Sequence, residues 1–164
     1  MAKKRKVILC SVLIMSLLIG SCSLYSWYYP NVHIKNFDGL QSHYERIVNV
    51  VTIFYNEQVE KKDLTFIINI PEYTLSYGDI DIILSVEEQE SLKIICKSAY
   101  RVEYSYIRVT SFDVSFWVGE MVEYAIFYTT NLYETYKTVK KYASDDPKLK
   151  RINKNWYELS SYHL

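Results

Sequence analysis

The fold class follows from the segment Val102-Glu-Tyr-Ser-Tyr-Ile-Arg-Val109 and from Phe112-Asp-Val-Ser-Phe-Trp117, which comes soon after it. Within each segment the side chains alternate in character from one residue to the next, and this period of two is typical of a β-strand. Met121–Thr129 continues as a further strand after a turn at Gly119-Glu120. Short links between successive strands predict an antiparallel meander. We expect one face of these strands to meet helices and the other, coated with tyrosine, to face solvent or a partner.

Two helices are predicted before the meander. From Asp38 onward, apolar residues at helical spacing form one continuous stripe, made of Leu40, Tyr44, Ile47, Val48, Val51, Phe54 and Tyr55. Asp38, with Gln41 three residues later, is the expected N-terminal cap of this helix. Ser85-Val-Glu-Glu88 has the sequence of a capping box and predicts a second helix that ends near Ala99. Its expected core residues are Val86, Leu92, Ile95, Cys96 and Ala99.

Further elements complete the predicted domain. Leu64–Ile70 is rich in β-branched and aromatic residues and predicts a strand that stops at Pro71. Ile80–Leu84 is either a short strand or the approach to a helix. Asn131–Ala143 fits a helix, although its Thr and Tyr content also suits a strand extension, and Trp156–Leu159 predicts a last strand that packs its tryptophan on the core. The expected fold class is α+β, an antiparallel sheet of four to six strands with both helices packed on one face.

The N-terminal residues predict export. Lys3–Lys6 is a basic segment, and the uncharged apolar run Val7–Ile19 follows it. These are the two parts of a secretory signal. The run is shorter than the roughly 20 apolar residues that a membrane-spanning helix needs. It stops at the small residues Gly20 and Ser21, which suit a signal-peptidase site.

The segment Ile19-Gly20-Ser21-Cys22 resembles the lipobox of bacterial lipoproteins, in which an aliphatic residue and two small residues precede a cysteine. The resemblance implies cleavage between Ser21 and Cys22 and a diacylglyceryl group on the Cys22 thiol. Gly20 stands where Ala or Ser is more usual. Two acyl chains are enough for stable anchoring, whereas one is marginal. With its Tyr-, Ile- and Lys-rich composition, the chain resembles small lipoproteins of low-GC Gram-positive bacteria.

The expected organisation is therefore a signal peptide over residues 1–21, a membrane tether over 22–37 and a single α+β domain over 38–164. The alternative is an uncleaved anchor, because Val7–Trp27 is of low polarity and ends in aromatic residues that suit a membrane interface. Both interpretations place the rest of the chain at the extracytoplasmic face of the cell membrane.

Composition argues against several classes of function. From Cys22 onward the chain carries 15 Lys and Arg residues against 19 Asp and Glu, a net charge of −4 that disfavours a nucleic-acid partner. With Cys22 lipidated, only Cys96 remains in that part of the chain, and we expect it to be a buried small hydrophobe. No Cys/His spacing suits zinc and no glycine-rich loop suits a nucleotide, so neither metal nor cofactor is expected. His43 is expected on a helix surface rather than as a ligand.

The 17 tyrosines are the remaining functional signal. Tyr104 with Tyr106, and Tyr124 with Tyr128, stand at alternate strand positions, where tyrosine offers amphipathic contact area at low entropic cost. Core and surface packing explains the same composition. We expect a membrane-anchored surface lipoprotein, held through lipid on Cys22, whose domain is a non-enzymatic binding or interaction module for a protein or small ligand.

Two alternatives remain open at this point. One is a membrane-tethered envelope hydrolase that uses a carboxylate pair as acid and base, with Asp79 and Asp81 or Asp145 and Asp146 as candidates. Glycoside chemistry of that kind needs two carboxyl groups roughly 5 to 9.5 Å apart in a cleft. The other is a structural spacer or an immunity-type protein. Turn and cap roles explain the same aspartates, so no catalytic residue is assigned.

Overall fold

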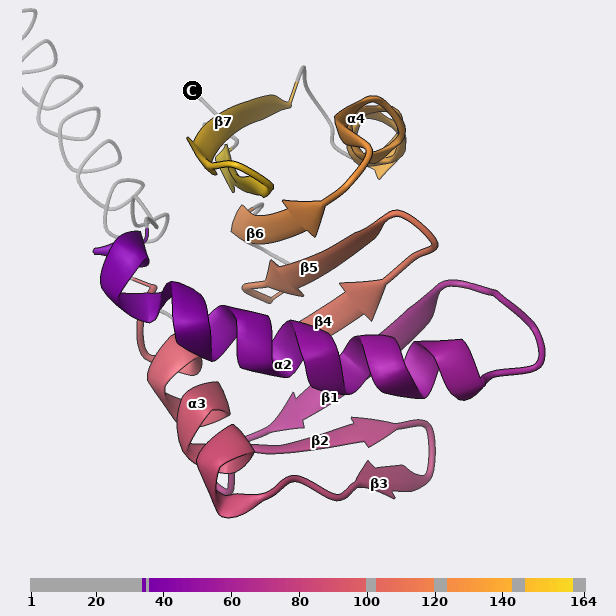
Figure 1. The fold of residues 1–164 in the computed structure, drawn as a ribbon, viewed down its shortest axis with the longest axis vertical. Coiled ribbons are helices and arrows are strands. Elements are labelled where there is room, and N and C mark those ends of the chain that lie inside the picture. The colour runs from indigo at the N-terminus through magenta and orange to yellow at the C-terminus, as the bar shows by residue number, and fades with distance from the viewer. Residues whose placement is uncertain (1–33, 35, 100–102, 120–123, 143–146, 161–164) are drawn as a thin grey trace, which may run out of the picture. The chain divides into compact units, whose positions relative to one another are not determined.

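An antiparallel sheet of eight strands lies at the centre of the fold (Figure 1). The strands are β1 Leu64–Asn69, β2 Thr74–Tyr77, β3 Ile80–Ile82, β4 Tyr106–Val109, β5 Asp113–Trp117, β6 Tyr124–Thr129, β7 Lys148–Asn153 and β8 Trp156–Ser160. Their order in the sheet is β3-β2-β1-β4-β5-β6-β8-β7. The helices are α2 Phe37–Glu57, α3 Val86–Cys96 and α4 Leu132–Tyr142. The computed structural model describes residues 34, 36–99, 103–119, 124–142 and 147–160.

The α+β class is confirmed, as are the first helix and the second helix packed with it, but the strand count is wrong. Eight strands exceed the expected four to six, because the sequence pattern did not predict β2 and β7. Both are paired through short turns to a neighbour: β2 to β3 around Gly78, which has a positive φ of 58°, and β7 to β8 through Lys154 and Asn155. Their sequences are polar or basic on one side, so pairing rather than apolar pattern makes them strands.

The stripe of α2 faces the main core, as predicted. Tyr44, Ile47 and Val51 are fully buried, and Leu40 and Phe54 are partly buried against them. Strand residues on the facing side of the sheet complete the core, among them Phe66, Ile107, Phe116 and Trp156. Burying an aliphatic or aromatic side chain of this size contributes about 1.5–3 kcal/mol relative to exposure. The α2 stripe therefore anchors the helix firmly to the sheet.

The cap predicted for α2 is wrong. The helix begins at Phe37, and its cap residue is Asn36, which has a left-handed backbone (φ 54°) and makes no side-chain cap hydrogen bond. Asp38 lies inside the first turn, where a carboxylate favours the helix dipole. Gln41 donates to the Glu45 carboxylate at 2.7 Å instead of reaching back to a cap.

The capping box of α3 is confirmed. The Ser85 amide donates to Glu88 Oε2 at 2.7 Å, and the Glu88 amide donates to Ser85 Oγ at 3.3 Å. The helix ends at Cys96 rather than near Ala99. Of the expected core residues, Leu92, Ile95, Cys96 and Ala99 are buried, but Val86 is 84% exposed because it stands at the first helical position, away from the sheet.

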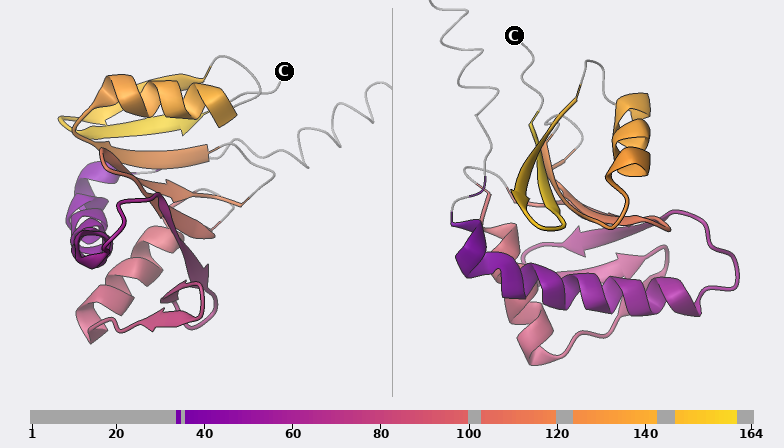
Figure 2. Two further views of the ribbon diagram at one scale, coloured as in Figure 1. Left: turned by 90° about the vertical axis from the view of Figure 1, so that its right-hand side faces the viewer. Right: turned by 45° about the horizontal axis from the view of Figure 1, so that its top comes forward.

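The predicted helix after the meander is present as α4, with the Glu134 amide donating to Asn131 Oδ1 at 3.3 Å. Its buried residues are Thr135 and Val139, whereas Leu132 is exposed. Val139 packs with Ala125, Phe127 and Leu159 in a second, smaller core cluster. Figure 2 shows α4 over the end of the sheet formed by β6, β8 and β7, away from α2 and α3.

Candidate functional site: the open sheet face

The two faces of the sheet have different surroundings. In β1, Leu64, Phe66 and Ile68 are buried toward α2 and α3, while Thr65 and Ile67 point to the opposite face and are exposed. Strand register places Arg108 beside Thr65 and Tyr106 beside Ile67, and Trp117 beside Tyr106 on the next strand. Residues directly opposite each other in a sheet share a face. These five residues, Thr65, Ile67, Tyr106, Arg108 and Trp117, are called the open face below.

An aromatic pair lies at the centre of the open face. The rings of Tyr106 and Trp117 are nearly parallel, with 7° between their planes and 6.0 Å between their centroids. Trp117 also meets Phe127 edge-on at 5.6 Å, which connects the open face to the cluster under α4. The Trp117 indole N–H donates to Ser115 Oγ at 2.9 Å. Since this is the only donor of the indole, what Trp117 presents outward is ring surface rather than a hydrogen-bonding group.

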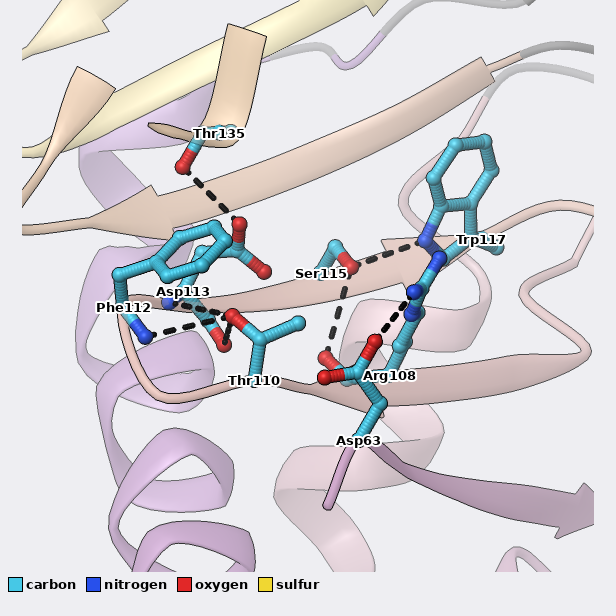
Figure 3. Close-up of polar contacts among 8 residues, drawn as sticks. All are labelled: Asp63, Arg108, Thr110, Phe112, Asp113, Ser115, Trp117 and Thr135. Carbon is cyan, nitrogen blue, oxygen red and sulfur yellow. Dashed lines mark hydrogen bonds and ion pairs between the residues drawn. The ribbon is translucent and has the colours of Figure 1, made fainter. Parts of the chain in front are cut away.

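An ion pair borders the aromatic pair. Arg108 Nη2 lies 2.5 Å from Asp63 Oδ2, just before β1 begins (Figure 3). The Arg108 side chain is half-buried and that of Asp63 is exposed. Charge-assisted hydrogen bonds of this kind hold a guanidinium in one orientation. The open face thus combines apolar rings with a fixed charged group at one side.

A buried carboxylate, Asp113, contacts the first turn of α4. The Thr135 hydroxyl donates to Asp113 Oδ2 at 2.9 Å, and the Asp113 amide donates to Thr110 Oγ1 at 3.0 Å (Figure 3). The Thr135 hydroxyl also lies 2.8 Å from the Thr129 hydroxyl. Burial raises the pKa of Asp113, while hydrogen bonds from Thr135 and Thr110 and the Arg108 charge act in the opposite direction. This cluster fixes the start of α4 to the end of β5.

Sequence reasoning did not single out Asp113, which it treated as one alternating residue of a strand. The available signal was a carboxylate inside a strand close to several threonines, Thr110, Thr129 and Thr135. Buried carboxylates are hydrogen-bonded or neutralised. Here the bonds join a strand to a helix, so the residue is an anchor between two elements.

Most of the tyrosines expected on a binding face lie in the core. Tyr104 and Tyr124 are buried on the helix side of the sheet, and Tyr128 packs against Trp156 there. Only Tyr106 reaches the open face. The prediction that Tyr104 and Tyr106 share a face is wrong because regular alternation begins only at Tyr106. Just before Tyr106, the backbone carbonyl of Ser105 accepts a hydrogen bond from the Ile68 amide, and the backbone amide of Ser105 donates to the Trp117 carbonyl.

The core tyrosines form a hydrogen-bonded series. Tyr44 donates to the Tyr104 hydroxyl at 3.0 Å and lies 2.8 Å from Ser98 Oγ. Tyr124 donates to Glu158 Oε1 at 2.9 Å. Burial raises the pKa of Tyr44, Tyr104 and Tyr124 above the usual value, so all three stay protonated at neutral pH. The series satisfies polar groups inside the core rather than presenting them to a ligand.

Of the two aspartate pairs considered for hydrolysis, only Asp79 and Asp81 lie within the described residues. Asp79 lies in the turn between β2 and β3 and Asp81 lies on β3, and both are exposed. Asp145 and Asp146 lie outside the described residues. In the described part of the chain, no group of three or more His, Cys, Asp and Glu side chains is arranged to hold a metal ion. The carboxylate-pair hypothesis therefore gains no support from Asp79 and Asp81.

His43 and Ser91 form a pair that sequence reasoning missed. Nδ1 of His43 lies 3.1 Å from Ser91 Oγ between α2 and α3, and Arg46 donates to the same oxygen at 2.8 Å. The Ser91 hydroxyl donates to the Glu87 carbonyl at 2.8 Å and is buried. With its hydrogen committed to a backbone carbonyl, Ser91 is not activated as a nucleophile. His43 is half-buried and links two helices rather than lying on a free helix surface.

Cys96 is a free, buried thiol, as expected. Burial raises its pKa to about 12, so it stays protonated and unreactive at neutral pH. Ser21 and Cys22, the residues expected at the cleavage and lipidation site, lie outside the described part of the chain. Of the helices that the structure describes, none has the length and apolar character to cross a membrane.

The described residues thus form an antiparallel sheet with two helices on one face and a third helix over one end of the other face. Aromatic side chains lie on the part of that second face that no described helix covers. Comparison of the chain with protein-family models, with curated proteins and with solved structures gave no match.

Proposed function

We propose that the protein is a lipid-anchored surface protein of the cell membrane, and that its domain binds a partner protein through the open face. The anchor rests on the basic segment Lys3–Lys6, the apolar run Val7–Ile19 and the lipobox-like Ile19–Cys22. In this proposal Cys22 carries the lipid and the domain works at the extracytoplasmic face. The binding role rests on the composition and position of the open face.

The binding role is supported mainly by one part of the sheet. Over β1, β4 and β5, no described helix covers the face opposite α2 and α3. Ile67 is 47% exposed there, and the Tyr106 and Trp117 rings lie beside it. Aromatic residues and arginine are enriched in the energetically important parts of protein interfaces. The open face brings two aromatic rings, an aliphatic side chain and an oriented arginine together on adjacent strands.

The shape of the open face favours a protein over a small ligand. Small-molecule sites are concave and enclose most of the ligand surface. Thr65, Tyr106 and Trp117 instead project from three neighbouring strands of one sheet face. Such a surface suits a partner of similar extent, with the Trp117 ring as an apolar anchor and the Arg108–Asp63 pair at its border.

Site-specific photocrosslinking on intact host cells tests the binding role. A photoreactive phenylalanine analogue at Ile67 is expected to crosslink a discrete partner, and Trp117→Ala in the same chain should remove that product. The matched control carries the analogue at Tyr133, an aromatic residue of α4 that is 73% exposed and lies outside the open face. Equal products from both positions, or a product that persists with Trp117→Ala, would contradict the proposal.

The intact mass of the protein extracted from host membranes tests the anchor. A mass that begins at Cys22 and includes a diacylglyceryl group, and that is lost with Cys22→Ser, supports lipidation. A mass that begins at Met1 in both proteins would overturn it and indicate an uncleaved anchor. The crosslinking result does not depend on which anchor is present, so the two halves of the proposal fail separately.

A further inference from the structure

The two edges of the sheet carry opposite charge. At one edge, β3 and its turn expose Asp79 and Asp81, and Glu87 follows in the first turn of α3. At the other edge, β7 exposes Lys148, Lys150 and Arg151. Among the residues that the structure describes, β3 and β7 are the edge strands, and each pairs with a neighbouring strand on one side alone. The molecule therefore has an acidic sheet edge and a basic one.

The acidic edge also exposes apolar side chains. Ile80 is 54% exposed, and Ile83, just beyond β3, is 96% exposed. Val86, at the start of α3, adds a third exposed aliphatic side chain within seven residues. Concentrated exposure of this kind at a strand edge is a template for pairing with another chain. A basic strand with aliphatic residues between its charges would complement it.

Strand β7 has that composition. Its sequence Lys148-Leu-Lys-Arg-Ile-Asn153 places half-buried Leu149 and Ile152 among the basic residues. The register of β7 on β8 is regular as far as Arg151 and shifts between Arg151 and Asn153. The regular part of β7 and the short β3 are therefore of similar length, and the irregularity limits how far pairing extends.

We propose that β7 of one copy pairs with β3 of a second copy, so that this protein associates head to tail through its sheet edges. The alternation of strand directions supports this arrangement. All eight strands pair antiparallel with their neighbours, so β3 and β7 run in opposite directions. A second copy in the same orientation brings its β3 antiparallel to β7 of the first, and the sheet continues without reversing a protomer.

Charge selects this contact over the alternatives. Two β7 edges would place lysines opposite lysines, and two β3 edges would place aspartates opposite aspartates, which is destabilising in a cross-strand pair. Lysine on an edge strand usually blocks edge-to-edge association. Here it blocks only pairing between like edges, because the other edge of the same sheet is acidic. The contact is heterologous, and such contacts give rings or open chains of subunits rather than closed dimers.

Sedimentation velocity of the full-length protein in non-ionic detergent tests the proposal, over about 10–200 μM protein and at about 0.05 and 0.5 M salt. The unaltered chain is expected to form species larger than the monomer at low salt that dissociate at high salt. Asp79→Lys with Asp81→Lys, or Lys148→Glu with Lys150→Glu, should each lower the association constant by about 10-fold or more.

A mixture of the two charge-reversed proteins is the decisive sample, because each variant again finds an edge of opposite charge on the other. Restored association supports head-to-tail pairing. Glu45→Lys with Glu57→Lys makes the same change in net charge as Asp79→Lys with Asp81→Lys, but on the exposed surface of α2, and should leave association unchanged. A monomer under all conditions, equal loss in the α2 control, or a mixture that stays monomeric would overturn the proposal. Circular dichroism establishes that each variant is folded.

Discussion

The two halves of the second sheet face belong to different strands of one sheet and differ in what covers them. Over β6 and β8, Phe127 and Leu159 are buried beneath Val139 of α4. Over β1 and β4, no helix of the described structure covers this face (Figure 2), and Ile67 of β1 is 47% exposed. Both halves alternate in the same way along the strand. The difference teaches that the covered half contributes to the core under α4, whereas the other half keeps part of its side-chain surface exposed.

The largest expected difference between the halves is in the cost of truncation. Phe127→Ala removes a buried ring from the cluster under α4 and should lower the free energy of unfolding by about 3–4 kcal/mol. Ile67→Ala on the open face should change it by about 0.5 kcal/mol or less, as is usual for surface positions. Urea unfolding followed by circular dichroism measures both. Similar losses would mean that the open face is covered in the folded protein.

The next test asks which of two nearby tyrosines faces the core. Tyr104 and Tyr106 lie on opposite faces of the sheet. Tyr104→Phe removes the hydroxyl that accepts from Tyr44 in the core and should cost about 1–2 kcal/mol. Tyr106→Phe keeps the ring that stacks on Trp117 at a partly buried position and should cost less than Tyr104→Phe. Urea midpoints at neutral pH provide the comparison. A larger cost for Tyr106→Phe than for Tyr104→Phe would mean that Tyr106, and not Tyr104, faces the core.

Local signals predicted much of the fold. The stripe of α2 and the capping box of α3 are encoded within a few turns, so both helices were found from the sequence. What the sequence did not reveal depends on contacts between distant segments. Tyr104 faces the core because Ser105 bonds to Ile68 and Trp117, and β7 is a strand because it pairs with β8. The open face likewise depends on where α4 packs, which no local pattern specifies.

The buried carboxylate of Asp113, under the first turn of α4, should make the free energy of unfolding depend on pH. Burial raises the pKa of Asp113 above the usual aspartate value of about 3.8, so the folded state holds this proton more tightly than the unfolded state. The contribution of Asp113 to stability is therefore full below about pH 3.8 and falls as the pH rises through the folded-state value. Asp113→Asn keeps an oxygen acceptor for Thr135 without the charge and should remove this part of the dependence.

Urea unfolding between about pH 3.5 and 7 measures that effect. The difference in unfolding free energy between Asp113→Asn and the unaltered chain should shift in favour of the variant as the pH rises. Asp81→Asn, at an exposed position of β3, is the control for the loss of one carboxylate from the chain. If the free energy of unfolding changed with pH in the same way for Asp113→Asn and for the unaltered chain, the Asp113 carboxylate would not be desolvated beneath α4.

The smallest effect on stability is expected for the ion pair of the open face. Asp63 is exposed, and exposed ion pairs contribute about 0–1 kcal/mol, so Asp63→Asn should change the unfolding free energy by about 0.5 kcal/mol or less and only at low salt. The same change removes the ion pair between Asp63 and Arg108. If the open face binds a protein, crosslinking from Ile67 should therefore fall although stability does not. A loss of stability with crosslinking intact would instead make the ion pair a structural feature like the Asp113 cluster, and the contrast between the two halves would lose its functional meaning.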